Sequence, residues 1–146
     1  MLSRALIALT LFAMPACADD VRYQGIVEKV IDGDTLVVDV EDWPAPFRSA
    51  RVRVHGIDTP ESRRGRNGAK CELELRRGQS VKSWLRRVLP VGTIVDLQWM
   101  GKRDKYGRPV MRIFLPDGRN LGRTMLQQHL ALAYDGKRKA SFCMVR

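Results

Sequence analysis

The stretch "RVHGIDTPE", from Arg53 to Glu61, contains side chains that could carry out acid–base and phosphate chemistry. Asp58 and Glu61 are carboxylates that can accept a proton from water, and the guanidinium of Arg53 can bind a phosphate through paired hydrogen bonds. The tetrapeptide "DTPE" also fits the start of a helix, with Asp as the N-cap, Pro in the first turn and Glu completing a capping box. From this stretch alone, a reaction centre and a helix cap are both open.

A second acidic stretch, "DGD", contains Asp32 and Asp34. It is typical of a turn, because Asp and Gly tolerate the backbone angles that turns require. In a small barrel, however, a hairpin end and a neighbouring strand end can converge. Two carboxylates that meet there repel each other unless a cation lies between them, and hard oxygen ligands suit Ca²⁺ or Mg²⁺.

Two arginines could supply positive charge to such a centre. Arg53 lies five residues before Asp58, and Arg108 ends the loop motif "DKYGR". Two guanidiniums can hold one phosphate, and they are most effective where negative charge develops in a transition state. The alternatives are a surface strand residue for Arg53 and a loop cation for Arg108.

The elements that must position these residues begin with three predicted strands. These are residues 22–31, 35–40 and 51–57, with a proline-containing loop at 41–50. In the third strand, Val52 and Val54 would lie on one face, with Arg51, Arg53 and His55 on the other. On a regular strand Arg53 and Asp58 would then point to opposite faces, so they can share a site only if the chain bends, for example at Gly56.

The second half of the chain predicts two helices and two strands. One helical face contains Val81, Trp84, Leu85, Val88 and Leu89, and Pro90-Val91-Gly92 ends that helix. Strands follow at 93–99 and 109–115 and a helix at 120–129, with basic loops at 62–70 and 101–108 and an irregular basic tail. The order β-β-β-α-β-β-α predicts a β-barrel with helices (α+β), a five-stranded OB-like fold in one domain of residues 19–146.

Residues 1–18, "MLSRALIALTLFAMPACA", predict a secretory signal peptide. A basic residue precedes a short apolar run, and Ala16-Cys17-Ala18 has the A-x-A pattern of a cleavage site. The run is too short for a membrane span. We therefore expect an exported protein, periplasmic or extracellular, without stable membrane association after cleavage. A retained N-terminal anchor and lipidation of Cys17 are the alternatives.

The chain is strongly basic, with a formal net charge of +10. Cleavage after Ala18 would lower this charge to +9, because the segment carries one Arg and no acid. Such a field attracts polyanions such as nucleic acid or an anionic membrane surface. A solvated basic surface that serves solubility is the alternative.

Two cysteines, Cys71 and Cys143, remain after cleavage. In an oxidising compartment an even pair predicts a disulfide, which here would join the middle of the chain to its tail. Two free thiols are the alternative. A zinc site is not expected, because the sequence has no CxxC motif and its histidines are His55 and His129.

The motifs "VIDGDTLVV", "RVHGIDTPE" and "DKYGR" resemble, in order and spacing, those of the staphylococcal nuclease (thermonuclease) family. The resemblance extends from about Tyr23 to Tyr134. It implies an SNase-like OB-fold and Ca²⁺-dependent endonuclease activity that cleaves DNA and RNA and leaves 3′-phosphates. The loop at 41–50 and the loop after Glu61 are longer than in the family, which leaves substrate preference open.

The resemblance also implies the metal ligands. Asp34 and Asp58 match the carboxylates that bind calcium, and Thr59 matches the residue whose backbone carbonyl joins them. Asp32 matches a nearby acid in the surroundings of the metal.

Further roles follow from the same resemblance. Arg53 and Arg108 match the arginines that bind the scissile phosphate, and Glu61 matches the proposed general base. Contacts with nucleic acid would come from Lys105 and Tyr106, which match residues at a nucleotide's terminal phosphate, and from Tyr134, which partly represents the aromatic residues of the family's nucleotide pocket. Independently of the resemblance, the basic loop after Glu61, with Arg63 and Arg64, is expected to hold the strand through its charge.

The sequence thus predicts an exported, monomeric, calcium-dependent endonuclease that acts on DNA and RNA. The main alternative is a non-catalytic OB-fold module that binds single-stranded nucleic acid, because basic charge and fold suit both functions. The complete set of acids and arginines favours catalysis. A basic protein bound to anionic envelope lipid is a third hypothesis, but the sequence lacks a clear amphipathic basic helix.

Overall fold

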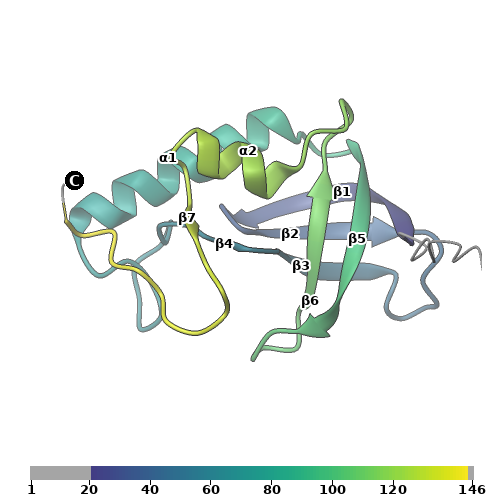
Figure 1. Ribbon diagram of the computed structural model, residues 1–146, viewed down its shortest axis with the longest axis horizontal. Coiled ribbons are helices and arrows are strands. Elements are labelled where there is room, and N and C mark those ends of the chain that lie inside the picture. The colour runs from purple at the N-terminus through teal and green to yellow at the C-terminus, as the bar shows by residue number, and fades with distance from the viewer. Residues whose placement is uncertain (1–20, 145–146) are drawn as a thin grey trace, which may run out of the picture.

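The computed structural model describes residues 21–144, so the predicted signal peptide lies outside the described residues. Five strands close into a barrel in the order β1-β2-β3-β6-β5, and both helices lie along its upper side in the view of Figure 1. The strands are β1 (Arg22–Asp32), β2 (Thr35–Val40), β3 (Ser49–Val54), β4 (Ile57–Asp58), β5 (Ile94–Arg103), β6 (Pro109–Phe114) and β7 (Leu132–Ala133), and the helices are α1 (Glu72–Val88) and α2 (Leu121–Gln127). The predicted α+β fold with a five-stranded OB-like barrel is confirmed.

The apolar positions that the periodicities predicted form the core of this barrel. Alternate residues of β2 point inward, as expected for a strand with one face on a core. Helix α1 covers the barrel with side chains one turn apart, and α2 adds a second set. These fully or nearly fully buried residues are Leu36, Val38, Val40, Val81, Leu85, Leu89, Leu121 and Met125.

Several elements differ from the prediction. Strand β5 continues to Arg103, so the basic connection to β6 is shorter than the expected loop at 101–108. Helix α1 begins at Glu72, well before the apolar set at Val81, because its first turns are mostly polar and carry little periodicity. Strands β4 and β7 pair in a separate two-stranded sheet, and two-residue strands are too short to show a pattern.

The prediction of one continuous strand at 51–57 is wrong. The chain leaves the strand after Val54, and this interruption brings residues of the site together. Strand β3 ends at Val54, and the chain turns through Gly56, which has a φ of +78°, before β4 starts at Ile57. This left-handed conformation favours glycine because it has no Cβ. The turn allows Arg53 and Asp58 to face the same region, which a regular strand would not.

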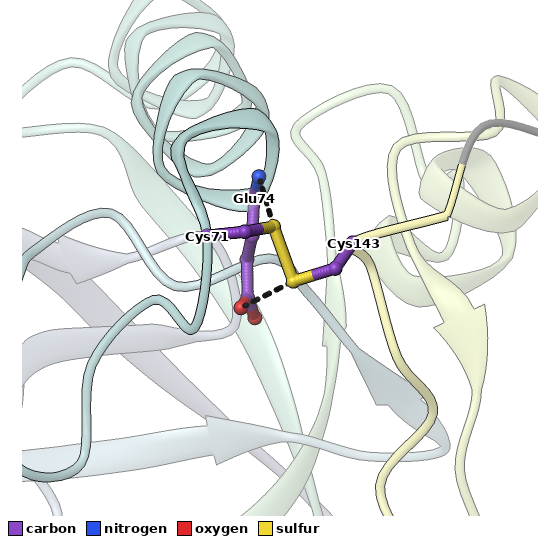
Figure 2. Close-up of side chains that lie close together, drawn as sticks. All are labelled: Cys71, Glu74 and Cys143. Carbon is purple, nitrogen blue, oxygen red and sulfur yellow. Dashed lines mark hydrogen bonds between the residues drawn. A yellow bond between two sulfur atoms is a disulfide. The ribbon is translucent and has the colours of Figure 1, made fainter.

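Cys71 and Cys143 form a disulfide across a sequence separation of 72 residues (Figure 2). Cys71 is also the N-cap of α1, where its Sγ accepts a hydrogen bond from the backbone N–H of Glu74 at 3.4 Å. The side chain of Glu74 in turn accepts a hydrogen bond from the backbone N–H of Lys70, the residue before the cap, at 2.7 Å. The disulfide thus fastens the C-terminal segment to the start of α1, and Figure 1 shows the two segments at the same end of the molecule.

Removing this disulfide by the double substitution Cys71→Ser and Cys143→Ser is expected to lower the free energy of unfolding by about 2–4 kcal/mol. The bond closes a long loop and restricts the unfolded chain. Serine is itself a good N-cap residue, so the loss would report on the cross-link and not on the cap. Urea denaturation with and without reductant measures the effect. Reductant should leave the double variant unchanged, and an unaltered midpoint for the reduced natural protein would contradict the expectation.

Among the described residues, no helix is both long enough and apolar enough to cross a membrane.

Candidate active site

The candidate active site lies in a cleft of about 1530 Å³. The turn between β1 and β2, the end of β3, the loop between β5 and β6, and the segment beyond β7 all contribute to its walls. Its lining includes most of the predicted site residues, namely Asp34, Arg53, Asp58, Glu61, Arg63, Lys105, Tyr106, Arg108 and Tyr134. The topology therefore brings together residues that are up to 100 positions apart in the chain.

Arg53 is the central cation of this cleft. Its Nη1 lies 2.7 Å from Asp34 Oδ2, and its Nη2 lies 3.2 Å from Asp58 Oδ1. Nη2 also donates to the backbone carbonyl of Ile57 at 3.1 Å, and the guanidinium lies 5.5 Å from the ring centre of Tyr134. Burial would lower the pKa of Arg53, but Asp34 and Asp58 raise it. One guanidinium thus links two carboxylates that would otherwise repel each other.

A hydrogen-bonded chain connects the second arginine to the first. Arg108 Nη1 donates to Thr35 Oγ1 at 3.0 Å, and Thr35 Oγ1 donates to Asp34 Oδ1 at 3.0 Å. Asp104 holds Arg108 from the other side, with its Oδ2 2.6 Å from Nε. Burial would raise the pKa of Asp104, but the hydrogen bonds from Arg108 and nearby backbone lower it. The orientation of Arg108 is therefore fixed on two sides.

Helix α1 packs directly on the backbone that carries Glu61. A Cβ added to Gly78 would lie 2.3 Å from the carbonyl oxygen of Glu61 and 2.7 Å from that of Pro60. No side-chain rotation relieves a contact with backbone, so α1 can approach this closely only with glycine at this position. Gly78 therefore determines where Glu61 lies relative to the cleft.

The substitution Gly78→Ala is expected to lower the free energy of unfolding by about 1–3 kcal/mol, the usual cost of overpacking. An exposed glycine in a helix would instead be stabilised by alanine, by about 1 kcal/mol. Urea denaturation gives the sign, with Ser80→Ala at an exposed position of the same helix as the control. A Gly78→Ala protein more stable than the natural one would show that the contact with Glu61 is not limiting.

The donor set at the turn between β1 and β2 fits a hard divalent cation. Asp34 and Asp58 are 5% and 1% exposed and converge on Arg53. Thr59 is adjacent, since its backbone N–H donates to Asp34 Oδ2 at 3.3 Å. Asp32 Oδ1 is buried and has no hydrogen-bond partner among the described residues, which a hydrated cation would provide. Such oxygen ligands suit Ca²⁺ or Mg²⁺.

A separate group, made of Cys71, Glu74 and Cys143, does not suit a metal ion. Within residues 21–144, Cys71, Glu74 and Cys143 form the one group of three or more such side chains whose ligand atoms all lie within 4.8 Å of one another. Their sulfurs are bonded to each other (Figure 2), so no thiolate is available as a ligand.

Comparison with known families agrees with the motifs and the geometry. Residues 51–143 match the family described as staphylococcal nuclease homologue, which is more than half of the chain. The chain belongs to the staphylococcal nuclease family. The match includes Arg53, Asp58, Glu61 and Arg108, whereas the turn with Asp34 precedes it.

Several relatives carry nuclease names. An uncharacterized endonuclease of Escherichia coli O157:H7 is 29% identical over 132 residues, which are 88% of this chain and 71% of that protein. Endonuclease YhcR of Bacillus subtilis is 26% identical over 115 residues, which are 77% of this chain but 9% of that much longer protein. An uncharacterized protein of Methanocaldococcus jannaschii, MJ1439, is 32% identical over 115 residues, with 68% of this chain and 52% of that protein covered.

One of the residues predicted to contact nucleic acid lies apart from this constellation. Arg64 is exposed and forms an ion pair with Glu72 at the start of α1, outside the lining of the cleft. Arg63 does line the cleft, where its Nη2 is 3.6 Å from Asp32 Oδ2. Lys105 and Arg108 flank the exposed ring of Tyr106, at 5.1 and 5.2 Å from its centre.

Sequence reasoning missed Thr35, Gly78 and Lys139 as site residues. Thr35 is the first residue of the predicted strand at 35–40, and Gly78 lies before the apolar set on which the helix was predicted. Lys139 lies in the basic tail, which has no periodicity. An ion pair joins its Nζ to Glu61 Oε1 at 2.9 Å. For Thr35, its position directly after "DGD" was the available signal.

Proposed function

We propose that this protein is an exported, calcium-dependent endonuclease that hydrolyses phosphodiester bonds of DNA and RNA and leaves 3′-phosphates. The observation that carries the proposal is the convergence of Arg53, Arg108 and Glu61 with the carboxylates of Asp34 and Asp58 in one basic cleft. Family membership and the endonuclease names of two relatives support it.

The chemistry follows from the charges of these groups. A phosphodiester is an anion and repels a hydroxide-like nucleophile, so positive charge must be supplied where negative charge develops. Arg53 and Arg108 contribute guanidiniums that can bind two non-bridging oxygens of one phosphate. Glu61 can accept a proton from the attacking water.

A divalent cation, held by Asp34, Asp58 and the carbonyl of Thr59, would polarise the phosphate and neutralise part of its charge. With a cation there, Asp34 and Asp58 would no longer need Arg53 as their shared partner. The guanidinium of Arg53 could then turn its N–H donors to the substrate. The cleft cations Arg63 and Lys105 would hold the strand on either side through its backbone phosphates.

Export rests on the sequence of residues 1–18 and agrees with the chemistry of the cysteines. A disulfide such as Cys71–Cys143 persists in oxidising compartments such as the periplasm or the extracellular space. We propose that the protein works there as a monomer.

A non-catalytic nucleic-acid-binding module is the competing function, because the basic cleft alone would suit it. The experiment that separates the two incubates the purified protein with labelled single-stranded DNA and with RNA, in Ca²⁺ and in chelator. The proposal predicts cleavage in Ca²⁺ alone, with fragments whose new 3′ ends become extendable by a polymerase only after phosphatase treatment. Fragments with free 3′-hydroxyls would refute the stated bond cleavage, and uncut, tightly bound strands would establish a binding module.

A further inference from the structure

Lys139 bonds to two carboxylates of the candidate active site at once. Its Nζ lies 3.1 Å from Asp58 Oδ1 and 2.9 Å from Glu61 Oε1. The Asp58 side chain is 2% exposed, whereas that of Lys139 is 48% exposed. Burial alone would lower the pKa of Lys139, but the hydrogen bond to Glu61 and the charge of Asp58 raise it. A charged ammonium thus reaches from the solvent side onto a buried acid.

The segment that carries Lys139 is fixed at both ends. We call residues 134–142 the C-terminal strap. Directly before the strap, β7 pairs with β4, and at the start of the strap the backbone N–H of Tyr134 donates to the carbonyl of Gly56 at 3.0 Å. At its far end, Phe142 is buried and Cys143 is bonded to Cys71. Because both ends are anchored, the ammonium of Lys139 is held at a high effective concentration beside the carboxylates.

The ammonium of Lys139 occupies the space beside Asp58 and Glu61 that a bound cation and the attacking water would use. Asp58 Oδ1 forms ion pairs with both Arg53 Nη2, at 3.2 Å, and Lys139 Nζ, at 3.1 Å. A divalent cation on the Asp58 carboxylate would lie close to the ammonium, and like charges at such short range repel. An ammonium bonded to Glu61 Oε1 also occupies a carboxylate oxygen that would have to accept the proton of the attacking water.

We propose that Lys139 is a built-in competitor of the divalent cation, and that the C-terminal strap is an autoinhibitory element which the cation must displace. The Cys71–Cys143 disulfide holds the strap in place, so that breaking the bond favours the displaced state. The effect on cleavage rests on the proposed function. The competition between Lys139 and the cation does not, and it can be measured without nucleic acid.

The test is calorimetric titration of the protein with Ca²⁺ alone. The Lys139→Gln variant is expected to bind Ca²⁺ about fivefold more tightly than the natural protein, as for the loss of one competing ion pair. Lys137→Gln is the matched control, because it removes the same charge from the same strap. The Lys137 side chain is 87% exposed and faces Asp135 at 4.0 Å, so its variant should bind Ca²⁺ like the natural protein.

A second measurement tests the role of the disulfide. The double variant with serine at positions 71 and 143 is expected to bind Ca²⁺ more tightly than the natural protein, and adding Lys139→Gln to it should bring little further gain. Unchanged or weaker Ca²⁺ binding by the Lys139→Gln variant would overturn the inference, as would an absence of binding by both proteins.

The two proposals fail in different ways. If the natural protein cleaves DNA in Ca²⁺ but Lys139→Gln leaves the affinity for Ca²⁺ unchanged, the strap is not inhibitory and the nuclease assignment stands. If the natural protein cleaves nothing but Lys139→Gln tightens Ca²⁺ binding, the nuclease assignment fails and the competition by Lys139 stands.

Discussion

Replacing Glu61 by glutamine is expected to lower the rate of Ca²⁺-dependent cleavage of single-stranded DNA by about 10²–10⁴-fold, the usual contribution of a general base. Glutamine has nearly the same shape as glutamate, but its amide does not take a proton from water. The backbone of Glu61 is held against α1 at Gly78, so the variant should keep the geometry of the cleft. Single-turnover rates measure the chemical step without product release.

Glu72→Gln is the matched control for this experiment. Glu72 is an exposed glutamate at the start of α1 and pairs with Arg64 and Arg76 outside the cleft. Its substitution removes the same charge from the protein and should leave the cleavage rate close to that of the natural protein. An equal, small effect of Glu61→Gln and Glu72→Gln would contradict the role of Glu61 as the base.

Replacing Arg53 by alanine is expected to have two effects. In the absence of divalent cation it should lower the free energy of unfolding by about 3–5 kcal/mol, because it leaves Asp34 and Asp58 as buried charges without their shared partner. Saturating Ca²⁺ should restore much of this stability, since the cation compensates the same two carboxylates. The cleavage rate in Ca²⁺ should still fall, by about 10²–10³-fold, because the phosphate loses a donor.

Urea denaturation with and without Ca²⁺ measures the first effect, and single-turnover cleavage the second. Arg51→Ala is the matched control, because Arg51 lies on the same strand with its side chain exposed. Its substitution should change stability little in either condition. If Arg53→Ala and Arg51→Ala were equally stable without cation, Arg53 would not be the link between the two buried acids.

Much of the barrel could be predicted because its signals are local. The alternation in β2 and the apolar face of α1 each follow from burying one side of a regular element. The position of Asp34 in a turn and that of Arg108 after "DKYG" also lie within single motifs. The resemblance to the family then linked these motifs, whereas composition and spacing alone did not decide between a structural and a catalytic role for each motif.

The parts that could not be predicted depend on contacts between distant segments. The sequence named a bend at Gly56 as the condition for Arg53 and Asp58 to share a site, but the regular alternation of residues 51–57 did not show that the chain bends there. Gly78 matters because of a backbone that lies 17 residues earlier in the chain, at Glu61. Lys139 reaches the cleft because the disulfide and β7 fix the strap, and no pattern in the basic tail indicates this placement.

In the proposed reaction, one cation-assisted centre breaks the phosphodiester bond, and it is built by Arg53, Asp34, Asp58, Glu61 and Arg108. The most direct test uses excess protein on an end-labelled single-stranded DNA and follows binding and cleavage in the same samples, first in Ca²⁺ and then in chelator. We predict that the strand is bound in both conditions and is cut in Ca²⁺ alone. Strands that are bound but not cut in either condition, or cut equally well in chelator, would contradict it.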